Sequence, residues 1–504
     1  MSSDSSAKQC VRTAEKHELS VLIRAGNRLL SLETRDEPRA CKLFDHVHRE
    51  LGRPLFHWSA ASGLSRRDID MDPPDDGDSP EAALRLIRER RDQSIFLLVD
   101  FHPYLDNPVH VRLLREIAGN TEPNAPTVVL ISPELDLPRE LHPLAAQFEL
   151  TPPTAKELEQ MLREEGSHWA EHYGNGRKVT ASRRAFERMI TNLEGLPMKD
   201  ARRLARNAIH HDGALTEEDL PRVMEAKFEL LDPGGVLSFE METERFADVA
   251  GLPNLQRWLD QRAQVFSAPE PPPGLDMPRG ALLLGVQGCG KSLAARAAAG
   301  LFGVPLLHLD CGALFNKYHG ETERNLRESL ESSELMAPCV LWIDEIEKGL
   351  STSDSDGGTS GRVLGTFLTW MAEREERVFL VATANDVTSL PPELIRKGRF
   401  DEIFFVDLPD RQARAEILRI HLQNRDQDPA AFDLDSLAET AEGFSGAELE
   451  QAVVAALYEA FSRSESLSDR HLQEELQNTR PLSVTRAEEI NQLREWAAER
   501  TVRA

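Results

Sequence analysis

Residues 281–292 read ALLLGVQGCGKS, an apolar run followed at once by a glycine-rich turn. The turn fits the pattern G-x-x-x-x-G-K-[ST], with Gly285, Gly290, Lys291 and Ser292 at its defining positions. An alanine-rich segment comes next, so the pattern predicts a buried strand, a loop and then a helix. In that order of elements, the pattern indicates a loop that binds phosphate groups.

The loop has the chemistry that a nucleoside triphosphate requires. Glycines let the backbone point its N–H groups at phosphate oxygens, and the helix N-terminus adds partial positive charge. Lys291 is placed to reach the β- and γ-phosphates, and Ser292 offers a hydroxyl to Mg²⁺. Cys289 is small enough to fit, although its oxidation would block the loop. We expect these residues to bind ATP: Gly285, Val286, Gln287, Gly288, Cys289, Gly290, Lys291 and Ser292.

Two later strands end in polar side chains. Residues 337–347 read APCVLWIDEIE, in which Asp344 is placed to hold Mg²⁺ and Glu345 to accept a proton from an attacking water. Residues 378–386 read VFLVATAND, in which Asn385 is placed to orient that water. At this distance after the phosphate loop, the acidic strand end predicts an ATPase site, while a turn-forming role is the alternative for Asn385.

Short apolar runs alternate with helix-like segments twice along the 504 residues. The predicted fold is α/β, with a RecA-like P-loop sheet, a C-terminal helical lid and a degenerate N-terminal copy of both. The predicted domains are a flexible tail (1–14), a degenerate α/β domain (15–153), a helical lid-like domain (154–230), a linker (231–245), the ATPase α/β domain (246–409), and a helical lid with C-terminal helices (410–504).

Three pairs of similar segments support a tandem duplication. GRPLFHW at Gly52 resembles GVPLLHL at Gly303, the strand ending in Asp100 resembles the one ending in Asp344, and Gly195 resembles Gly443 in its surroundings. The alternative to a duplication is that the similarity reflects only the general likeness of strands in α/β proteins. Aligned with a shift of 252, the first copy has lost the phosphate loop: Glu33 stands for Gly285, Pro38 for Gly290, Arg39 for Lys291 and Ala40 for Ser292. We therefore expect no hydrolysis there, and Asp100 to be a leftover carboxylate.

Composition restricts the partners. With 59 basic and 85 acidic residues the net charge is −26, which disfavours binding to nucleic acid or to anionic lipid, apart from a local basic patch at Arg202, Arg203 and Arg206. The five cysteines are scattered without a CxxC pair, which argues against disulfides or a zinc site and fits a reducing cytoplasm. No signal peptide or membrane span is expected.

Beyond these motifs the chain resembles the AAA family over residues 246–460. FADVAGLPNLQRWL (246–259) is similar to the family's entry segment, which implies nucleotide binding by Asp248, Val249 and Gly251. GFSGAELEQAV (443–453) resembles the lid segment, which implies that Gly446 and Ala447 approach the nucleoside. In LPPELIRKGRFDEIFFVDLPD (390–410), Arg396 and Arg399 stand where the family carries arginine fingers for a neighbouring subunit, and this implies a homo-oligomeric ring, such as a hexamer.

The family's pore loop has a counterpart in LFNKYHGETERNLRESL (314–330), where Tyr318 and His319 match the positions that face the channel in members that thread polypeptide. Residues 345–371 resemble more narrowly the AAA ATPases encoded by a hypothetical reading frame of algal plastid genomes and by many bacteria. The chain departs from the family pattern at two places. Residues 371–378 read MAEREERV and lead into the strand that ends in Asn385, and Lys397 stands where most members have a proline.

The leading hypothesis is a Mg²⁺-dependent ring ATPase that remodels or threads protein substrates. The alternative is a nucleotide-controlled assembly switch or scaffold that regulates a partner. A nucleic-acid motor is the third possibility, which the acidic charge disfavours.

Overall fold

The computed structural model describes residues 13–69, 78–133, 135–174, 177–231, 235–241, 249–268, 271–315, 322–350, 359–396 and 398–504. The chain divides into two compact units. The first holds residues up to 179 together with 193–213, and the second holds residues 180–192 and 214–504. Each unit contains one α/β sheet, as the sequence predicts.

The first unit is built on a six-stranded sheet with the order β3-β2-β4-β5-β1-β6. All neighbouring strands are parallel except β3, which pairs antiparallel with β2. The strands are β1 (Leu29–Glu33), β2 (Leu55–Ser59), β3 (Gly63–Arg66), β4 (Ile95–Val99), β5 (Thr127–Ser132) and β6 (Ala145–Phe148).

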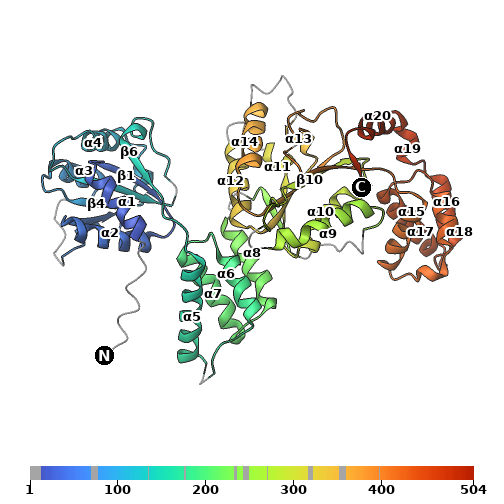
Figure 1. Cartoon of the computed structure of the whole chain (residues 1–504), viewed down its shortest axis with the longest axis horizontal. Helices are drawn as coiled ribbons and strands as arrows, with labels where there is room; N and C mark the ends of the chain where they lie inside the picture. Colours follow the sequence, from blue (N-terminus) through green and yellow to red (C-terminus); the bar gives the residue numbers. More distant parts are fainter. Residues whose placement is uncertain are drawn as a thin grey trace. The chain divides into compact units, whose positions relative to one another are not determined.

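Helices cover both faces of this sheet, because successive apolar side chains of each strand point to opposite sides (Figure 1). Leu30 and Leu32 face the first pair of helices, α1 (Thr13–Arg24) and α2 (Glu37–Leu51). Leu29 faces the second pair, α3 (Pro80–Glu89) and α4 (Pro108–Ala118). The unit also contains α5 (Ala155–His172) and α7 (Met198–Asp212), and the short 3₁₀ turns η1 (His102–Tyr104) and η2 (His142–Leu144).

The second unit is built on a seven-stranded sheet with the order β15-β14-β10-β13-β12-β11-β9. Only β9 is antiparallel to its neighbour. The strands are β9 (Leu237–Glu240), β10 (Gly280–Gly285), β11 (Leu306–Asp310), β12 (Cys339–Asp344), β13 (Val378–Ala384), β14 (Glu402–Val406) and β15 (Val502–Arg503). Before them lie β7 (Thr180–Ala181), α6 (Arg183–Leu193), β8 (Ala214–Leu215), η3 (Glu217–Asp219) and α8 (Leu220–Leu231).

This sheet also lies between two helical layers (Figure 1). Leu283 and Phe379 belong to the core beneath α9 (Pro253–Ser267) and α10 (Lys291–Phe302). Leu282 and Leu380 belong to the opposite core, beneath α11 (Cys311–Phe315), α12 (Thr322–Leu335), α13 (Ile346–Leu350) and α14 (Thr359–Glu373).

The C-terminal helices form a lid with a core of its own, in which Leu418, Leu449 and Leu472 are fully buried. It consists of α15 (Arg411–Gln423), η5 (Pro429–Ala431), α16 (Leu434–Thr440), α17 (Gly446–Ser462) and α18 (Asp469–Asn478), followed by α19 (Leu482–Thr485) and α20 (Ala487–Ala498). None of the helices in the described part of the chain combines the length and the apolar character that crossing a bilayer requires.

Two edge strands depart from the predicted organisation. The segment 231–245, expected as a linker, contains β9, whose Leu237 and Phe239 pair with Leu309 and Leu307 of β11. The segment 410–504, expected to be helical, ends in β15, and the backbone N–H of Ala504 donates to the carbonyl oxygen of Phe405 at 3.0 Å. Both strands are too short for periodicity to identify, and both are stabilised by pairing with a sheet that is distant in sequence.

The two sheets repeat one topology. Taken in chain order, β1, β2, β4, β5 and β6 have the same neighbours as β10, β11, β12, β13 and β14. Gly195 and Gly443 share a left-handed backbone, with φ of 81° and 82°. Asp100 and Glu345 share another, with φ of 52° and 48°. The predicted tandem fold is therefore confirmed, but the backbone matches Asp100 to Glu345 rather than to Asp344.

The loop after the first strand is shorter in the N-terminal copy. Glu33 ends β1 as Gly285 ends β10, but α2 begins at Glu37 after three residues, whereas α10 begins after five. The Asp36 side chain caps α2 by accepting from the Arg39 backbone N–H. The predicted equivalence of Pro38, Arg39 and Ala40 to Gly290, Lys291 and Ser292 is therefore wrong, because two residues of the loop are missing.

We predict that the full chain binds one nucleotide per chain. Two carboxylates, Asp36 and Glu37, stand at the start of α2, where a phosphate would be repelled. Lys291→Ala should weaken ADP binding by about 10- to 100-fold, since a charge-assisted hydrogen bond contributes about 1.5–3 kcal/mol. Arg39→Ala, the matched control, should leave stoichiometry unchanged in isothermal titration calorimetry. Two nucleotides per wild-type chain would contradict the prediction.

Candidate functional site

The glycine-rich loop connects β10 to α10 at the carboxyl edge of the second sheet. A side chain at Gly285 would place its Cβ 2.0 Å from the carbonyl oxygen of Val406, so only glycine lets β10 pair with β14 along its full length. Gly288 and Gly290 have φ of 77° and 91°, which L side chains rarely adopt. These three glycines bend the backbone so that the loop encloses the start of α10.

Lys291 lies inside this loop. Its Nζ donates to the carbonyl oxygens of Gly285 and Val286, both at 2.9 Å. Burial lowers the pKa of Lys291 to about 8. Two neutral carbonyls compensate a buried ammonium only in part, so the loop is suited to an anion beside Nζ. Ser292 follows at the second position of α10 and is half-buried.

Cys289 is a protonated thiol rather than a reactive one. Burial raises its pKa to about 12, and its Sγ contacts the carbonyl oxygen of Gln287 at 3.9 Å. Since the thiolate is the form that is oxidised, this environment argues against redox control of the loop.

The carboxylates after β12 are positioned by a threonine on the neighbouring strand. Thr383 of β13 is 1% exposed, and its hydroxyl donates to Asp344 Oδ1 while accepting from the Glu345 backbone N–H at 3.0 Å. This one hydroxyl therefore joins the two acidic residues to the strand that ends in Asn385. Glu345 has a left-handed backbone, with φ of 48°, directly after the last residue of β12.

Glu345 is held at both carboxylate oxygens. Asn385 Nδ2 donates to Oε1 at 2.8 Å, and Lys348 forms an ion pair with Oε2. Within the described residues, Asn385 Oδ1 is buried without a hydrogen-bond partner. An orphaned buried acceptor of this kind fits a water or a metal-bound ligand beside Glu345.

Glu347 adds a third carboxylate behind the first two. Its Oε1 accepts from the Asn385 backbone N–H at 2.9 Å, while its Oε2 is buried with no partner in the described part of the chain. Burial raises the pKa of Glu347. The residues Thr383, Glu347 and Lys348 were missed in the sequence, although a threonine inside the otherwise apolar strand VFLVATA was an available signal.

The lid contacts the loop directly. The Ala447 backbone N–H donates to the Gly288 carbonyl oxygen at 3.0 Å, and a Cβ at Gly446 would lie 3.2 Å from that oxygen. Ser445 and Glu448 form a capping box that begins α17 at this point. Val249 packs against the core beneath α9 and α10, and Gly251 lies close to Ala413 of α15. The structure thus brings Val249, Gly251, Gly446 and Ala447 to the same face of the unit as the loop.

The two arginines expected to act on a neighbouring subunit differ in their contacts. Arg399 Nη1 donates to the Leu368 carbonyl oxygen at 2.6 Å. Arg396 is exposed, and its side chain has no hydrogen bond or ion pair with any described residue. The expected residues Asp248, Tyr318 and His319, and the departure Lys397, lie outside the part of the chain that the structure describes.

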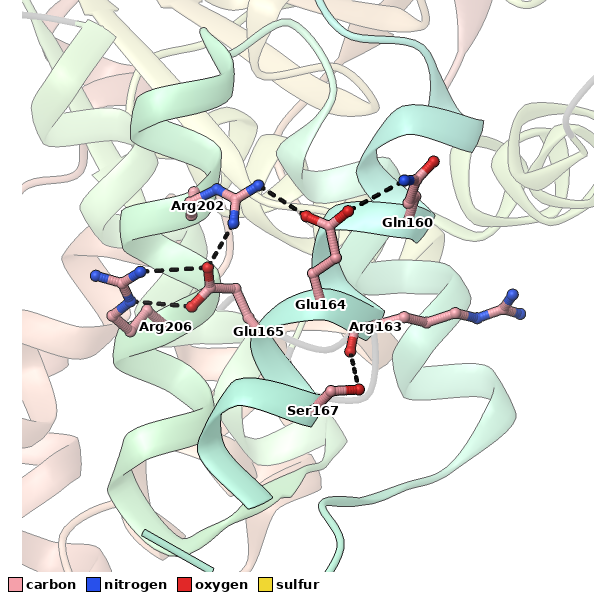
Figure 2. A network of polar contacts seen from close by, with 7 residues as sticks. All are labelled: Gln160, Arg163, Glu164, Glu165, Ser167, Arg202 and Arg206. Atoms are coloured by element: carbon pink, nitrogen blue, oxygen red, sulfur yellow. Dashed lines mark hydrogen bonds and ion pairs between the residues drawn. The ribbon is translucent and has the colours of Figure 1, made fainter. Parts of the chain in front are cut away.

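The basic patch considered at Arg202, Arg203 and Arg206 is neutralised (Figure 2). Arg202 and Arg206 both bind Glu165, at 2.7 and 3.0 Å, and Arg203 pairs with Asp200 at 3.4 Å. Although burial raises the pKa of Glu165, hydrogen bonds from Arg206 and Arg202 hold it below its ordinary value. Arg202 also contacts Glu164. Arg202 and Arg206 thus hold α7 to α5, Arg203 pairs within α7, and the three arginines do not form a free surface for phosphates.

We predict that Thr383→Val lowers ATP turnover by about 10- to 100-fold, as loss of a group that positions a ligand does. Valine keeps the shape but removes the hydroxyl that joins Asp344 to the Glu345 backbone. Thr383→Ser retains the hydroxyl and should stay close to wild type. Turnover is measured beside thermal unfolding; equal activity of the valine variant would remove Thr383 from the site.

Comparison with known proteins places these features in a family. Residues 281–408 match the ATPase family associated with various cellular activities (AAA), and residues 431–474 match the AAA+ lid domain. Residues 15–150 match the N-terminal domain of SpoVK-like AAA ATPases, and residues 156–234 match their second domain.

Relatives of full length extend the match. The chain is 33% identical to the AAA domain-containing protein ycf46 of Trieres chinensis over 96% of this chain and 97% of that protein. The ycf46 protein of Pyropia yezoensis is also 33% identical, with the same coverage. The proteasome-activating nucleotidase of Aeropyrum pernix is 39% identical over 38% of this chain and 48% of its own length. The chain therefore belongs to the AAA family of ATP-hydrolysing enzymes, and it resembles the ycf46 proteins along nearly its whole length.

Proposed function

We propose that this chain is a Mg²⁺-dependent ring ATPase that remodels or threads protein substrates. The observation that carries the ring is Arg396, an exposed guanidinium without an intramolecular partner among the described residues. It lies at the end of the segment after Asn385, three residues before Arg399. A guanidinium stabilises the charge that develops on a transferring phosphoryl group, and such groups are commonly supplied by a neighbouring molecule.

The residues at the carboxyl edge of the second sheet have separate roles in this proposal. Lys291 and the backbone N–H groups of the loop bind the phosphates of ATP, and Ser292 and Asp344 hold Mg²⁺. When bound, Mg²⁺ neutralises charge on the phosphate oxygens. Glu345 accepts a proton from the attacking water as the bond from oxygen to the γ-phosphorus forms and the bond to ADP breaks. Asn385 holds Glu345 and positions the water.

The lid supplies the mechanical link. Because Ala447 donates to Gly288, the start of α17 follows the conformation of the phosphate loop. A change between ATP and ADP in the loop therefore reaches the lid through one hydrogen bond and the glycine contacts around it. The acidic net charge of −26 favours proteins over nucleic acids as substrates. Among the relatives, the proteasome-activating nucleotidase is named for its action on a protein complex, which supports a protein-directed role for this chain.

We predict that ATP turnover depends on assembly and on arginines acting between chains. Turnover per chain should rise with protein concentration as light scattering reports larger particles. Glu345→Gln should abolish turnover but keep ATP binding, and Arg399→Ala should lower it by about 10³-fold.

The sharper test mixes the two inactive variants. A chain with Glu345 intact beside a chain with Arg399 intact completes a site, so mixing should restore part of the activity. Arg183→Ala, which removes a 92% exposed side chain elsewhere, is the control and should stay active. If a monomer hydrolyses ATP at full rate, or if mixing the variants restores no turnover, the ring proposal is wrong. A nucleotide-controlled switch that works as a single chain would then explain the results better.

We also predict that Tyr318→Ala separates remodelling from switching. A ring that threads protein should lose ATP-driven unfolding of a tagged fluorescent protein while its ATP turnover stays close to wild type. Tyr458→Ala, which removes a 74% exposed aromatic from the lid, is the matched control. Unfolding activity that survives Tyr318→Ala would favour an assembly switch or scaffold.

A further inference from the structure

Three side chains with metal-binding chemistry converge in the first unit, and none of them belongs to the candidate ATP site. Glu37 and Cys41 lie one turn apart on the same face of α2. His57 stands in the middle of β2, between Phe56 and Trp58, which face the opposite core. It therefore faces α2, and one ligand atom from each of the three residues lies within 4.8 Å of the other two.

We propose that Glu37, Cys41 and His57 form a binding site for one divalent cation of the zinc type. Thiolate, imidazole and carboxylate are the three ligand classes that zinc takes, at about 2.0–2.3 Å. A thiolate and a carboxylate also balance the charge of the ion.

The charges of Arg67 and Asp45 act on the cluster, but no hydrogen bond or ion pair among the described residues accounts for the placement of the three groups. Among the described residues, neither the Cys41 thiol, the His57 ring nor the Glu37 carboxylate makes a hydrogen bond or an ion pair. The nearest cation, Arg67, is occupied by Asp45, which accepts from Nε at 2.8 Å and from Nη2 at 3.1 Å. Its charge is therefore matched, and it does not take the place of a metal.

In the second copy, the histidine at the equivalent strand position is His308, and its contacts explain its placement without a metal. His308 is the third residue of β11, as His57 is of β2. It stacks on Trp342 with ring centroids 4.1 Å apart, and Nδ1 lies 3.3 Å from Ser238 Oγ. His57 has neither contact, and it faces a thiol and a carboxylate instead.

The exposure of Cys41 and Glu37 indicates how an ion would reach the site and what the site can do. Cys41 is 3% exposed, which keeps substrates from its sulfur and argues against a nucleophile. Glu37 is exposed at the first turn of α2, so the ion would enter past it. Three protein ligands leave a fourth position for water or for a group from a partner. A bound ion would join α2 to β2.

Cobalt titration of the full chain, freed of metal with a chelator, tests the proposal. We expect one Co²⁺ per chain, with a thiolate-to-cobalt charge-transfer band and the visible bands of a tetrahedral ion, both lost on adding Zn²⁺. Cys41→Ser should abolish the charge-transfer band. Cys311→Ser, which removes a buried thiol at the start of α11 in the second unit, is the matched control and should keep the band.

A substitution at an exposed residue tests the site without the risk that a buried substitution, such as Cys41→Ser, prevents folding. Glu37→Gln alters an exposed side chain at the start of α2. It should therefore leave thermal unfolding of the metal-free chain, and ATP turnover measured with added Mg²⁺, unchanged while weakening Co²⁺ binding by more than about tenfold. Absence of the charge-transfer band in the wild type, or its persistence in Cys41→Ser, would overturn the site. So would unchanged Co²⁺ affinity in Glu37→Gln.

Discussion

The close approach of β10 to β14 at Gly285 is the constraint on which the ATPase half depends. A Cβ at this position would lie 2.0 Å from the Val406 carbonyl oxygen, so the strand can remain paired to its last residue only without a side chain. The chain then turns through Gly288 and Gly290 into α10, and this turn brings Lys291 back onto the carbonyls of its own loop. Because all the central strands are parallel, Asp344 and Asn385 arrive at the same edge.

Hydrogen bonds from neighbouring side chains position the carboxylates at that edge of the sheet. The Thr383 hydroxyl holds Asp344 and the Glu345 backbone together, and Asn385 holds the Glu345 carboxylate. Buried acceptors on Asn385 and Glu347 remain unsatisfied in the described part of the chain. The free-energy cost of such atoms is offset when a polar ligand is bound, so they favour binding of a polar ligand at this edge. The lid joins this arrangement through Ala447 and Gly288.

The two halves of the chain share one strand topology but differ in the residues that follow the first strand of each sheet. The same strand order and the same left-handed turns recur, but the first loop is two residues shorter. Asp36 and Glu37 stand at the start of α2, where Gly290 and Lys291 stand at the start of α10. Packing of alternating apolar residues maintains a sheet whatever its loops contain. The loop is therefore free to change once phosphate binding is no longer needed, and Glu37 becomes available for another ligand beside Cys41 and His57.

The sequence by itself determined the two α/β sheets, the phosphate loop and the strand-end residues Asp344, Glu345 and Asn385, because apolar periodicity and short motifs are local properties. Tertiary structure alone decided the edge strands β9 and β15, since each is stabilised by pairing with a strand far away in the sequence. It also decided that Thr383 reaches Asp344 from the neighbouring strand, and that Arg202 and Arg206 of α7 are neutralised by Glu165 of α5. The same holds for Glu37, Cys41 and His57, which no spacing rule connects, because only the packing of α2 on β2 brings a helix face and a strand residue together.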